Sequence, residues 1–160
     1  MTDLADAQRR LGELVDRQQL ADLPSRLGML LDEGRFAELD SVFTADVVAD
    51  FPDFGGAHLD SLDALIAFAG DMPENFDSVQ HLIANVVVLD LDADRATMRA
   101  NLVWWSTYSA DDPTDYWVVG SVYRFQAVRT EVGWRLSRME LSGRWSDGRA
   151  PDFVQTPPQR

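Results

Sequence analysis

The chain has 160 residues, a length that supports one domain around a single hydrophobic core. Its 14 basic residues stand against 27 acidic ones, and the net charge of −13 repels phosphate backbones and anionic membrane surfaces. Nucleic acids and membranes are therefore not expected as partners. The chain has no cysteine, and all of its basic residues are arginines, which excludes thiolate nucleophiles, cysteine-bound metals and lysine Schiff bases.

The N-terminal segment is charged and periodic, and it lacks the apolar stretch of a secretory signal. No apolar run approaches the roughly 18 residues of a membrane-spanning helix. We therefore expect a cytoplasmic protein. Proton chemistry in it has to rely on the two histidines, on carboxylates or on tyrosines.

The first third of the chain is predicted to be helical. Apolar residues recur at helical spacing over residues 4–15 and 20–31, and the pattern ends at Gly34. Pro24 lies inside the second pattern, where it removes a helical hydrogen bond. We therefore expect two helices or one broken helix, with a kink at Pro24 or a helix start near Asp22.

Shorter elements follow up to residue 69. The pattern predicts a short helix over residues 36–43, a strand over 47–51 and a loop over the glycine-containing segment 53–58. A further helix is expected over residues 62–69, with Asp60 or Ser61 able to cap its N-terminus.

From Ser78 onward the sequence has the composition of strands. Four long stretches rich in β-branched and aromatic residues are separated by turns that contain Asp, Gly or Pro, and they cover residues 79–91, 96–108, 116–129 and 134–145. Together with the helices they predict a single α+β domain over residues 1–148, in which the helices cover one face of an antiparallel meander. Residues 149–160, which contain three prolines, are predicted to be a flexible tail.

Three segments of the chain resemble the SnoaL-like proteins of the nuclear transport factor 2-like superfamily. They are DRQQLADLPSRLGMLLDEGRFAELDSVFTADVVADF (residues 16–51), SVQHLIANV (78–86) and GSVYRFQAVRTEVGWRL (120–136). The resemblance covers roughly residues 11–145. It implies a cone, in which a curved antiparallel sheet of four long strands and a short fifth wraps around N-terminal helices and leaves an apolar pocket at its open end. Members of this superfamily include scytalone dehydratase, ketosteroid isomerase, limonene epoxide hydrolase and polyketide cyclases, alongside proteins without catalysis.

His81 is the strongest catalytic candidate. Alternation along its apolar strand places it on one face with Val79, Ile83 and Asn85, and its position in VQHLI matches a pocket histidine of scytalone dehydratase-like members. Imidazole titrates near neutrality and can transfer a proton at an enolisable carbon or a leaving hydroxyl. The alternative is a core histidine that is satisfied by a polar neighbour or that only orients a ligand.

Asp32, in the string LLDEG, matches an acid that orients a histidine in dehydratase relatives. A carboxylate bonded to one imidazole nitrogen fixes the tautomer and stabilises the imidazolium, so Asp32 and His81 would form an acid–base pair. The alternative is a solvated acid near the end of a helix, where the helix dipole disfavours it.

Tyr123 occupies a position where relatives often carry tyrosine, and its phenol could donate a hydrogen bond to a carbonyl or enolate oxygen. Its alternative is a role in the core or an interface. Three departures from the family weaken a dehydratase assignment: Phe125 replaces an acid, Leu27 replaces a tyrosine, and no second histidine lies near Ser106.

Aromatic and polar residues of the strands are candidates for ligand contact. Trp104 and Trp117 offer flat surfaces for a ligand or for a dimer interface, and Asn101 is a further polar candidate. Because Trp104 and Trp105 are adjacent in a strand, they must point to opposite faces, one to the pocket and one to a partner or the helix layer.

Two segments resemble metal-binding motifs but lack residues that a metal site needs. The string that starts at Asp90 begins like a calcium loop, but Arg95 and Asn101 stand where glycine and glutamate are needed, so it indicates a hairpin turn. His58, with Asp53 and Asp60 nearby, has no second histidine close by and is better explained as a solvated loop residue. No metal site and no cofactor are expected.

The resemblance, together with these residues, implies a cofactor-independent enzyme of the isomerase, dehydratase, cyclase or epoxide hydrolase type. It would act on an apolar substrate from polyketide or terpenoid chemistry, polycyclic molecules included, with His81 as acid or base, Asp32 as its orienter and Tyr123 as an oxyanion donor. The pocket would also contain Leu27. The alternative is a non-catalytic module that binds an apolar ligand or a protein partner. A homodimer is expected, because an open sheet with several tryptophans needs its second face covered.

Overall fold

The computed structural model describes residues 2–71, 75–152 and 154. The elements in chain order are α1 (Thr2–Asp32), a 3-10 helix η1 (Phe36–Ser41), β1 (Phe43–Phe51), β2 (Ala57–Leu59), α2 (Leu62–Gly70), β3 (Ser78–Leu91), β4 (Arg95–Thr107), β5 (Tyr116–Thr130) and β6 (Gly133–Gly148). The four long strands agree with their predicted bounds to within three residues.

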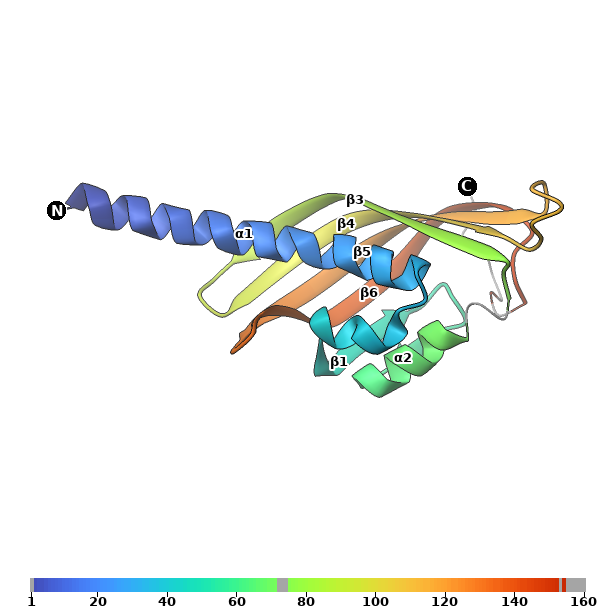
Figure 1. The fold of residues 1–160 in the computed structure, drawn as a ribbon, viewed down its shortest axis with the longest axis horizontal. Helices are drawn as coiled ribbons and strands as arrows, with labels where there is room; N and C mark the ends of the chain where they lie inside the picture. Colours follow the sequence, from blue (N-terminus) through green and yellow to red (C-terminus); the bar gives the residue numbers. More distant parts are fainter. Residues whose placement is uncertain (1, 72–74, 153, 155–160) are drawn as a thin grey trace.

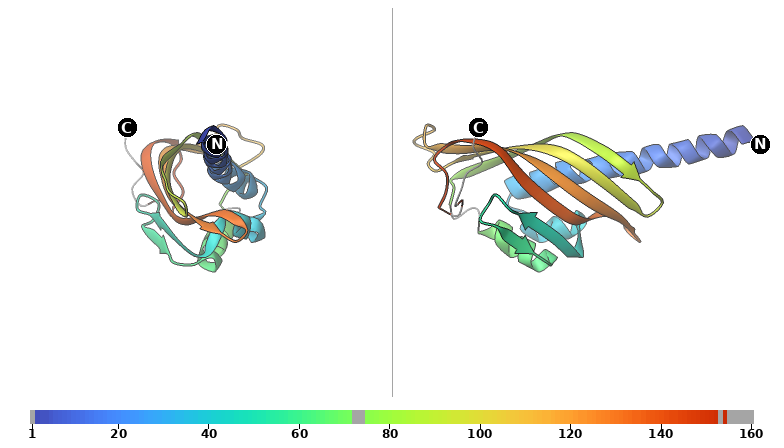
Figure 2. Two further views of the ribbon diagram at one scale, coloured as in Figure 1. Left: turned by 90° about the vertical axis from the view of Figure 1, so that its left-hand side faces the viewer. Right: turned by 180° about the vertical axis from the view of Figure 1, so that it is seen from behind.

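The strands form one sheet in the order β2-β1-β6-β5-β4-β3. The neighbours from β3 to β6 pair antiparallel, as a meander joined by turns must, and β1 pairs parallel with β6. The sheet curls strongly, and α1 runs along its concave side, while α2 and η1 lie near β1 (Figure 1; Figure 2, left). The predicted α+β cone is therefore confirmed, but the sheet has six strands rather than five and is mixed rather than wholly antiparallel.

Helix α1 is a single continuous helix, with Pro24 inside it. The proline removes one backbone hydrogen bond, at a cost of about 3 kcal/mol. That cost is offset because leucines on both sides of the proline are buried against the sheet, each worth roughly 2 kcal/mol: Leu20, Leu23, Leu27, Leu30 and Leu31. The helix start expected near Asp22 is therefore wrong.

The N-terminal half of α1 leaves its leucines exposed, whereas the C-terminal half buries its own. It extends beyond the sheet (Figure 1), and Leu4, Leu11 and Leu14 on its apolar stripe are exposed. Within the described residues, no helix is long and apolar enough to cross a membrane.

The region before α2 contains one strand that sequence analysis missed. Residues 57 and 58, expected in a loop, form β2 together with Leu59 and pair antiparallel with the end of β1. The helix expected over 36–43 is the shorter η1, and β1 begins at Phe43. Of the two possible caps for α2, Ser61 is used, since its hydroxyl accepts a hydrogen bond from the backbone N–H of Ala64 at 3.2 Å.

Strand β3 contains a bulge that changes which face its residues occupy. Its register with β4 shifts between Ala84 and Val87, and Asn85 has a φ of 53°, a left-handed conformation that asparagine tolerates better than most residues. Asn85 is exposed, so the prediction that it shares the inner face with His81 is wrong. Beyond the bulge, Val86 and Val88 pack against the core instead.

Residues that follow β6 pack on the sheet. The guanidinium of Arg149 donates to both carboxylate oxygens of Asp115, at 2.8 and 2.6 Å, and lies 3.5 Å from the ring centre of Tyr108. Pro151 and Val154 are buried. These contacts tie Arg149, Pro151 and Val154 to the domain, while the flexibility of the predicted tail stays a prediction, and residues 153 and 155–160 lie outside the described part of the chain.

Candidate active site

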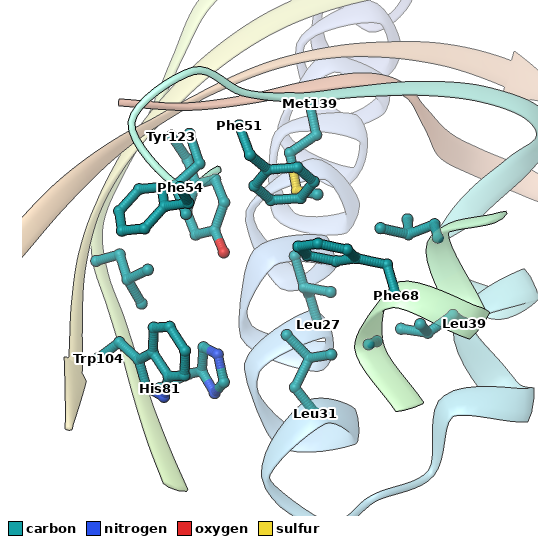
Figure 3. A pocket seen from close by; sticks show the side chains of 14 residues that line it. Leu27, Leu31, Leu39, Phe51, Phe54, Phe68, His81, Trp104, Tyr123 and Met139 are labelled. Carbon is teal, nitrogen blue, oxygen red and sulfur yellow. The ribbon is translucent and has the colours of Figure 1, made fainter. Parts of the chain in front are cut away.

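A cavity of about 70 Å³ lies between α1 and the inner face of the sheet, and α2 and the end of β1 close one side of it (Figure 3). Its walls are almost entirely apolar. Fourteen residues line it: Leu27, Leu31, Leu39, Phe51, Phe54, Leu65, Phe68, Ala69, His81, Leu102, Trp104, Tyr123, Met139 and Leu141. Polar groups in this wall therefore come from very few side chains, of which His81 and Tyr123 have titratable groups.

His81 and Asp32 form a closely bonded pair at this cavity. The Nδ1 atom of His81 lies 2.7 Å from Asp32 Oδ1, and the backbone N–H of His81 donates to the two carboxylate oxygens at 2.8 and 3.1 Å. The His81 side chain is only 4% exposed, and that of Asp32 is 26% exposed. Because a carboxylate only accepts hydrogen bonds, the proton of a neutral His81 is held at Nδ1, and Nε2 is the basic nitrogen.

The Nε2 atom of His81 makes no hydrogen bond to any residue in the described part of the chain. The imidazole also lines the cavity. An unoccupied basic nitrogen at an apolar cavity is what a general base requires, provided that the substrate reaches it.

Helix α1 packs closely on β3 at Gly28, where a methyl group would just make van der Waals contact and a larger side chain would not fit at this spacing. A Cβ atom placed on Gly28 would lie 3.4 Å from the His81 carbonyl oxygen and 3.5 Å from the His81 Cβ. Asp32 follows one turn later at the C-terminal end of α1, where the helix dipole disfavours a negative charge. The two N–H donors of His81 compensate this unfavourable position. The sequence pattern contained no signal for the role of Gly28.

Tyr123 also lines the cavity from the sheet, two strands away from His81. It comes from β5, is buried, and its ring stacks on that of Phe125 at 5.0 Å between centres. Its hydroxyl points toward the interior of the cavity (Figure 3) and makes no hydrogen bond to another described residue. Burial raises the pKa of the Tyr123 hydroxyl, so the phenol remains protonated and able to donate.

The predicted ligand-contact residues divide into two groups. Leu27 and Trp104 line the cavity, and Trp104 is 6% exposed. Trp105 points to the outer face, where it is 43% exposed and stacks on Tyr116.

Trp117 and Asn101 are not among the residues that line the cavity. Trp117 is buried beside Trp104, with the two rings edge-on and their centres 5.2 Å apart. Asn101 alternates with the buried Ala100 and Leu102, so it belongs to the outer face of β4. Contact of these two residues with a ligand therefore stays a prediction that this cavity does not support.

Much of the cavity wall consists of residues that sequence analysis did not select. Phe51 and Phe54 come from the end of β1 and the turn after it, and Phe68 comes from α2 (Figure 3). Apolar residues at such positions look like ordinary core residues in a sequence. Only the way the helices close over the sheet makes them a cavity wall.

His58 belongs to a separate pair on the surface. Its Nδ1 lies 2.6 Å from Asp50 Oδ1, while Arg138 donates to the other oxygen of Asp50, and the His58 side chain is 64% exposed. It lies in β2 rather than in a loop. Asp53 instead accepts a hydrogen bond from the backbone N–H of Gly143. The described residues contain no group of three or more acidic or histidine side chains placed to hold a metal ion.

A family model described as "SnoaL-like domain" matches residues 12–140, most of the chain. The chain belongs to the SnoaL-like domain family. The resemblance noted in the sequence is thus confirmed, and it covers both members of the His81–Asp32 pair. No curated protein matches the chain significantly.

Solved structures show the same fold. The protein Kfla4162 from Kribbella flavida is 28% identical, with a TM-score of 0.78, and the match covers 84% of this chain and 95% of that one. A candidate scytalone dehydratase from Novosphingobium aromaticivorans DSM 12444 is 18% identical, with a TM-score of 0.70, and covers 100% and 99% of the two chains. The hexachlorocyclohexane dehydrochlorinase LinA-type3 from Novosphingobium barchaimii LL02 is 15% identical, with a TM-score of 0.76, and covers 93% and 99%. At these identities, the last two structures show the fold alone.

Proposed function

We propose that this SnoaL-like protein is a proton-transfer enzyme, a lyase or isomerase, that acts on a compact apolar substrate without a cofactor. The observation that carries the proposal is the bonded pair of His81 and Asp32, whose Nε2 nitrogen is unoccupied by the described residues at the wall of an apolar cavity. Two solved structures of similar fold are those of a candidate dehydratase and a dehydrochlorinase, and both names denote eliminations.

In the proposed reaction, His81 Nε2 takes a proton from a carbon of the substrate. The electron pair of the broken C–H bond forms a C=C bond or an enolate. In an elimination, the leaving group departs with the electron pair of its own bond, as chloride while His81 releases its proton to solvent, or as water after the His81 imidazolium gives it that proton. In an isomerisation, the imidazolium returns the proton to another carbon of the substrate. Asp32 holds the imidazole and stabilises the imidazolium that forms, and the Tyr123 hydroxyl donates to the substrate oxygen on which charge develops.

The cavity limits the size and polarity of the substrate. An apolar cavity of about 150 Å³ holds one benzene molecule, and this cavity is about half as large. We therefore propose a substrate of one ring or a short open chain, admitted by movement of the wall, rather than the polycyclic molecule considered from sequence. The nearly apolar wall also offers too few polar partners to fix an attacking water, which favours elimination or isomerisation over epoxide opening.

A second candidate function is a module that binds an apolar ligand without chemistry. The observation that favours it is the hydrogen bond from the His81 backbone N–H to Asp32, because it gives the carboxylate a structural task between α1 and β3. The position of a histidine with an available Nε2 at the cavity opposes it.

Incubation with small one-ring probes in D₂O tests the proposal. Cyclohexanone reports proton abstraction through deuterium at its α-carbon, and 3-hydroxycyclohexanone and 3-chlorocyclohexanone report elimination through the enone. We expect at least one probe to react faster with the protein than in buffer. Calorimetric binding of these probes without exchange or product would contradict the enzyme and support the binding module.

We further propose that the chain forms a homodimer through the outer face of its sheet. Leu82, Leu89 and Trp105 expose large apolar side chains there, as an uncovered interface would. We expect sedimentation equilibrium at micromolar concentration to give twice the mass of the chain. A monomer would contradict the proposal.

A further inference from the structure

His81 has a second neighbour besides Asp32. Trp104 is its direct partner in the register of β3 and β4, and both side chains point into the cone. The indole and imidazole rings are stacked, with their centres 5.6 Å apart and their planes only 9° from parallel. The imidazole therefore contacts the Asp32 carboxylate at Nδ1 and the Trp104 indole on one of its two faces.

Trp104 is itself held by other rings. Phe76 meets it edge-on, with centres 5.6 Å apart and an interplanar angle of 78°. Trp117 also meets the Trp104 ring edge-on, with centres 5.2 Å apart and an interplanar angle of 72°. Both neighbours are buried. This packing leaves the indole little freedom to rotate, so it can act as a rigid wall for the imidazole.

Two consequences follow for His81. A rigid stacked wall keeps the imidazole plane in the orientation that directs Nδ1 to Asp32, so Nε2 keeps its direction as well. In addition, a cation within about 6 Å of the centre of an indole ring is attracted to its π face. The stack therefore favours the imidazolium that forms when His81 accepts a proton.

We propose that Trp104 is a positioning residue for His81, which orients the imidazole and stabilises its protonated form through the stacked indole face. The importance of this role for catalysis rests on the proposed function. The stacking of Trp104 on His81 is independent of that function. The sequence suggested Trp104 for contact with a ligand or for a dimer interface, so this role goes beyond both.

NMR spectroscopy of the whole chain, without ligand, tests the proposal. The chain has only two histidines, so the carbon-bound ring protons of His58 serve as an internal control. We expect the His81 ring signals of the unmodified protein to be displaced upfield by the indole ring current. Absence of this displacement would overturn the proposal, whatever the behaviour of any variant.

Substitution then measures the effect on protonation. Trp104→Leu removes the aromatic face and should lower the titration midpoint of His81 by roughly half a pH unit, because the imidazolium loses its π partner. Trp104→Phe should lower it by less. Asp32 on α1 is hydrogen-bonded to His81, Tyr123 on β5 is the other titratable residue that lines the cavity, and neither is changed by these substitutions.

Trp105→Leu is the matched control, since Trp105 is adjacent in β4 but points outward. It should leave the His81 midpoint unchanged. A folded Trp104→Leu protein with an unchanged His81 midpoint would overturn the proposal. If Trp104→Leu does not fold, Trp104→Phe decides in its place, and an unchanged midpoint in it counts against the proposal.

The turnover of any reactive probe gives a separate measurement. Trp104→Leu should lower kcat about tenfold with little change in KM, and Trp104→Phe should restore most of the loss. A change in KM alone would mean that Trp104 only contacts the substrate. If no probe reacts, the proposed function fails, while the NMR measurements still decide whether Trp104 orders His81.

Discussion

The two histidines of this chain form the same hydrogen bond in two different surroundings. Each places Nδ1 on an aspartate oxygen, at 2.7 Å for His81 with Asp32 and at 2.6 Å for His58 with Asp50. The His81 side chain is 4% exposed at an apolar cavity, whereas that of His58 is 64% exposed, and Arg138 shares its carboxylate.

The comparison shows that the surroundings of a histidine–aspartate pair decide whether it can serve in catalysis. In a site with little water, a charge on the imidazole interacts strongly with its carboxylate, and Nε2 meets only what enters the cavity. At the surface, solvent screens the same interaction, and its contribution is small. We therefore expect changes at the two pairs to differ greatly in effect.

The largest difference is expected in turnover. On any probe that the protein converts, His81→Ala and Asp32→Asn should each lower kcat about 10²-fold or more, and the double variant should lose little beyond that, because the two residues act as a unit. His58→Ala should change kcat less than twofold. Equal losses from His81→Ala and His58→Ala would break the comparison, and so would parent-level turnover in Asp32→Asn.

A smaller effect is expected from the spacing of α1 and β3. Gly28→Leu places a large side chain where a Cβ alone would already lie 3.4 to 3.5 Å from β3 atoms, so α1 must move away from His81. We expect a loss of about 1–3 kcal/mol in the free energy of unfolding, together with reduced turnover.

Gly12→Leu is the matched control on the same helix, because no atom lies within 4 Å of a Cβ built there. Its free energy of unfolding should not fall, since leucine is a better helix former than glycine. Denaturant unfolding measures both variants. A Gly28→Leu protein as stable as the parent would contradict the proposed close contact.

The smallest effect is expected at the surface pair and depends on pH. The hydrogen bond from His58, with the charge of Arg138, lowers the pKa of Asp50 in the folded protein. A carboxylate with a lowered pKa stabilises the fold above the pKa of the unfolded chain, near 4, and this contribution is lost as the pH falls through the folded value.

Asp50→Asn should therefore lower Tm at pH 7 by roughly 2 °C or less, and the difference from the parent should vanish at strongly acidic pH. Asp46→Asn, an exposed change on the same strand, is the control. Thermal unfolding followed by circular dichroism at the two pH values makes the measurement. A difference between Asp50→Asn and the parent that grows as the pH falls would show that the assigned cause is wrong.

The elements that the sequence predicted well are those with a strong local pattern. The strands β3 to β6 are long, rich in β-branched and aromatic residues and bounded by turns, so their number and order could be predicted. Residues 57–59 were missed because three residues in a glycine-rich segment have too little pattern, and they become a strand only by pairing with β1. The helix start expected near Pro24 was wrong, because burial of the flanking leucines outweighs the local preference of proline for a helix break.

Within the candidate site, the sequence by itself determined which residue types could transfer protons: two histidines, carboxylates and tyrosines, with no cysteine and no lysine. The resemblance then selected His81 and Asp32 as partners. Tertiary structure decided what no local pattern contains. Residues 49 positions apart meet because α1 packs closely on β3 at Gly28, the bulge at Asn85 turns its side chain outward, and Trp104 rather than Trp105 faces inward. These outcomes depend on which surfaces the folded chain brings together, and periodicity within one segment cannot determine that.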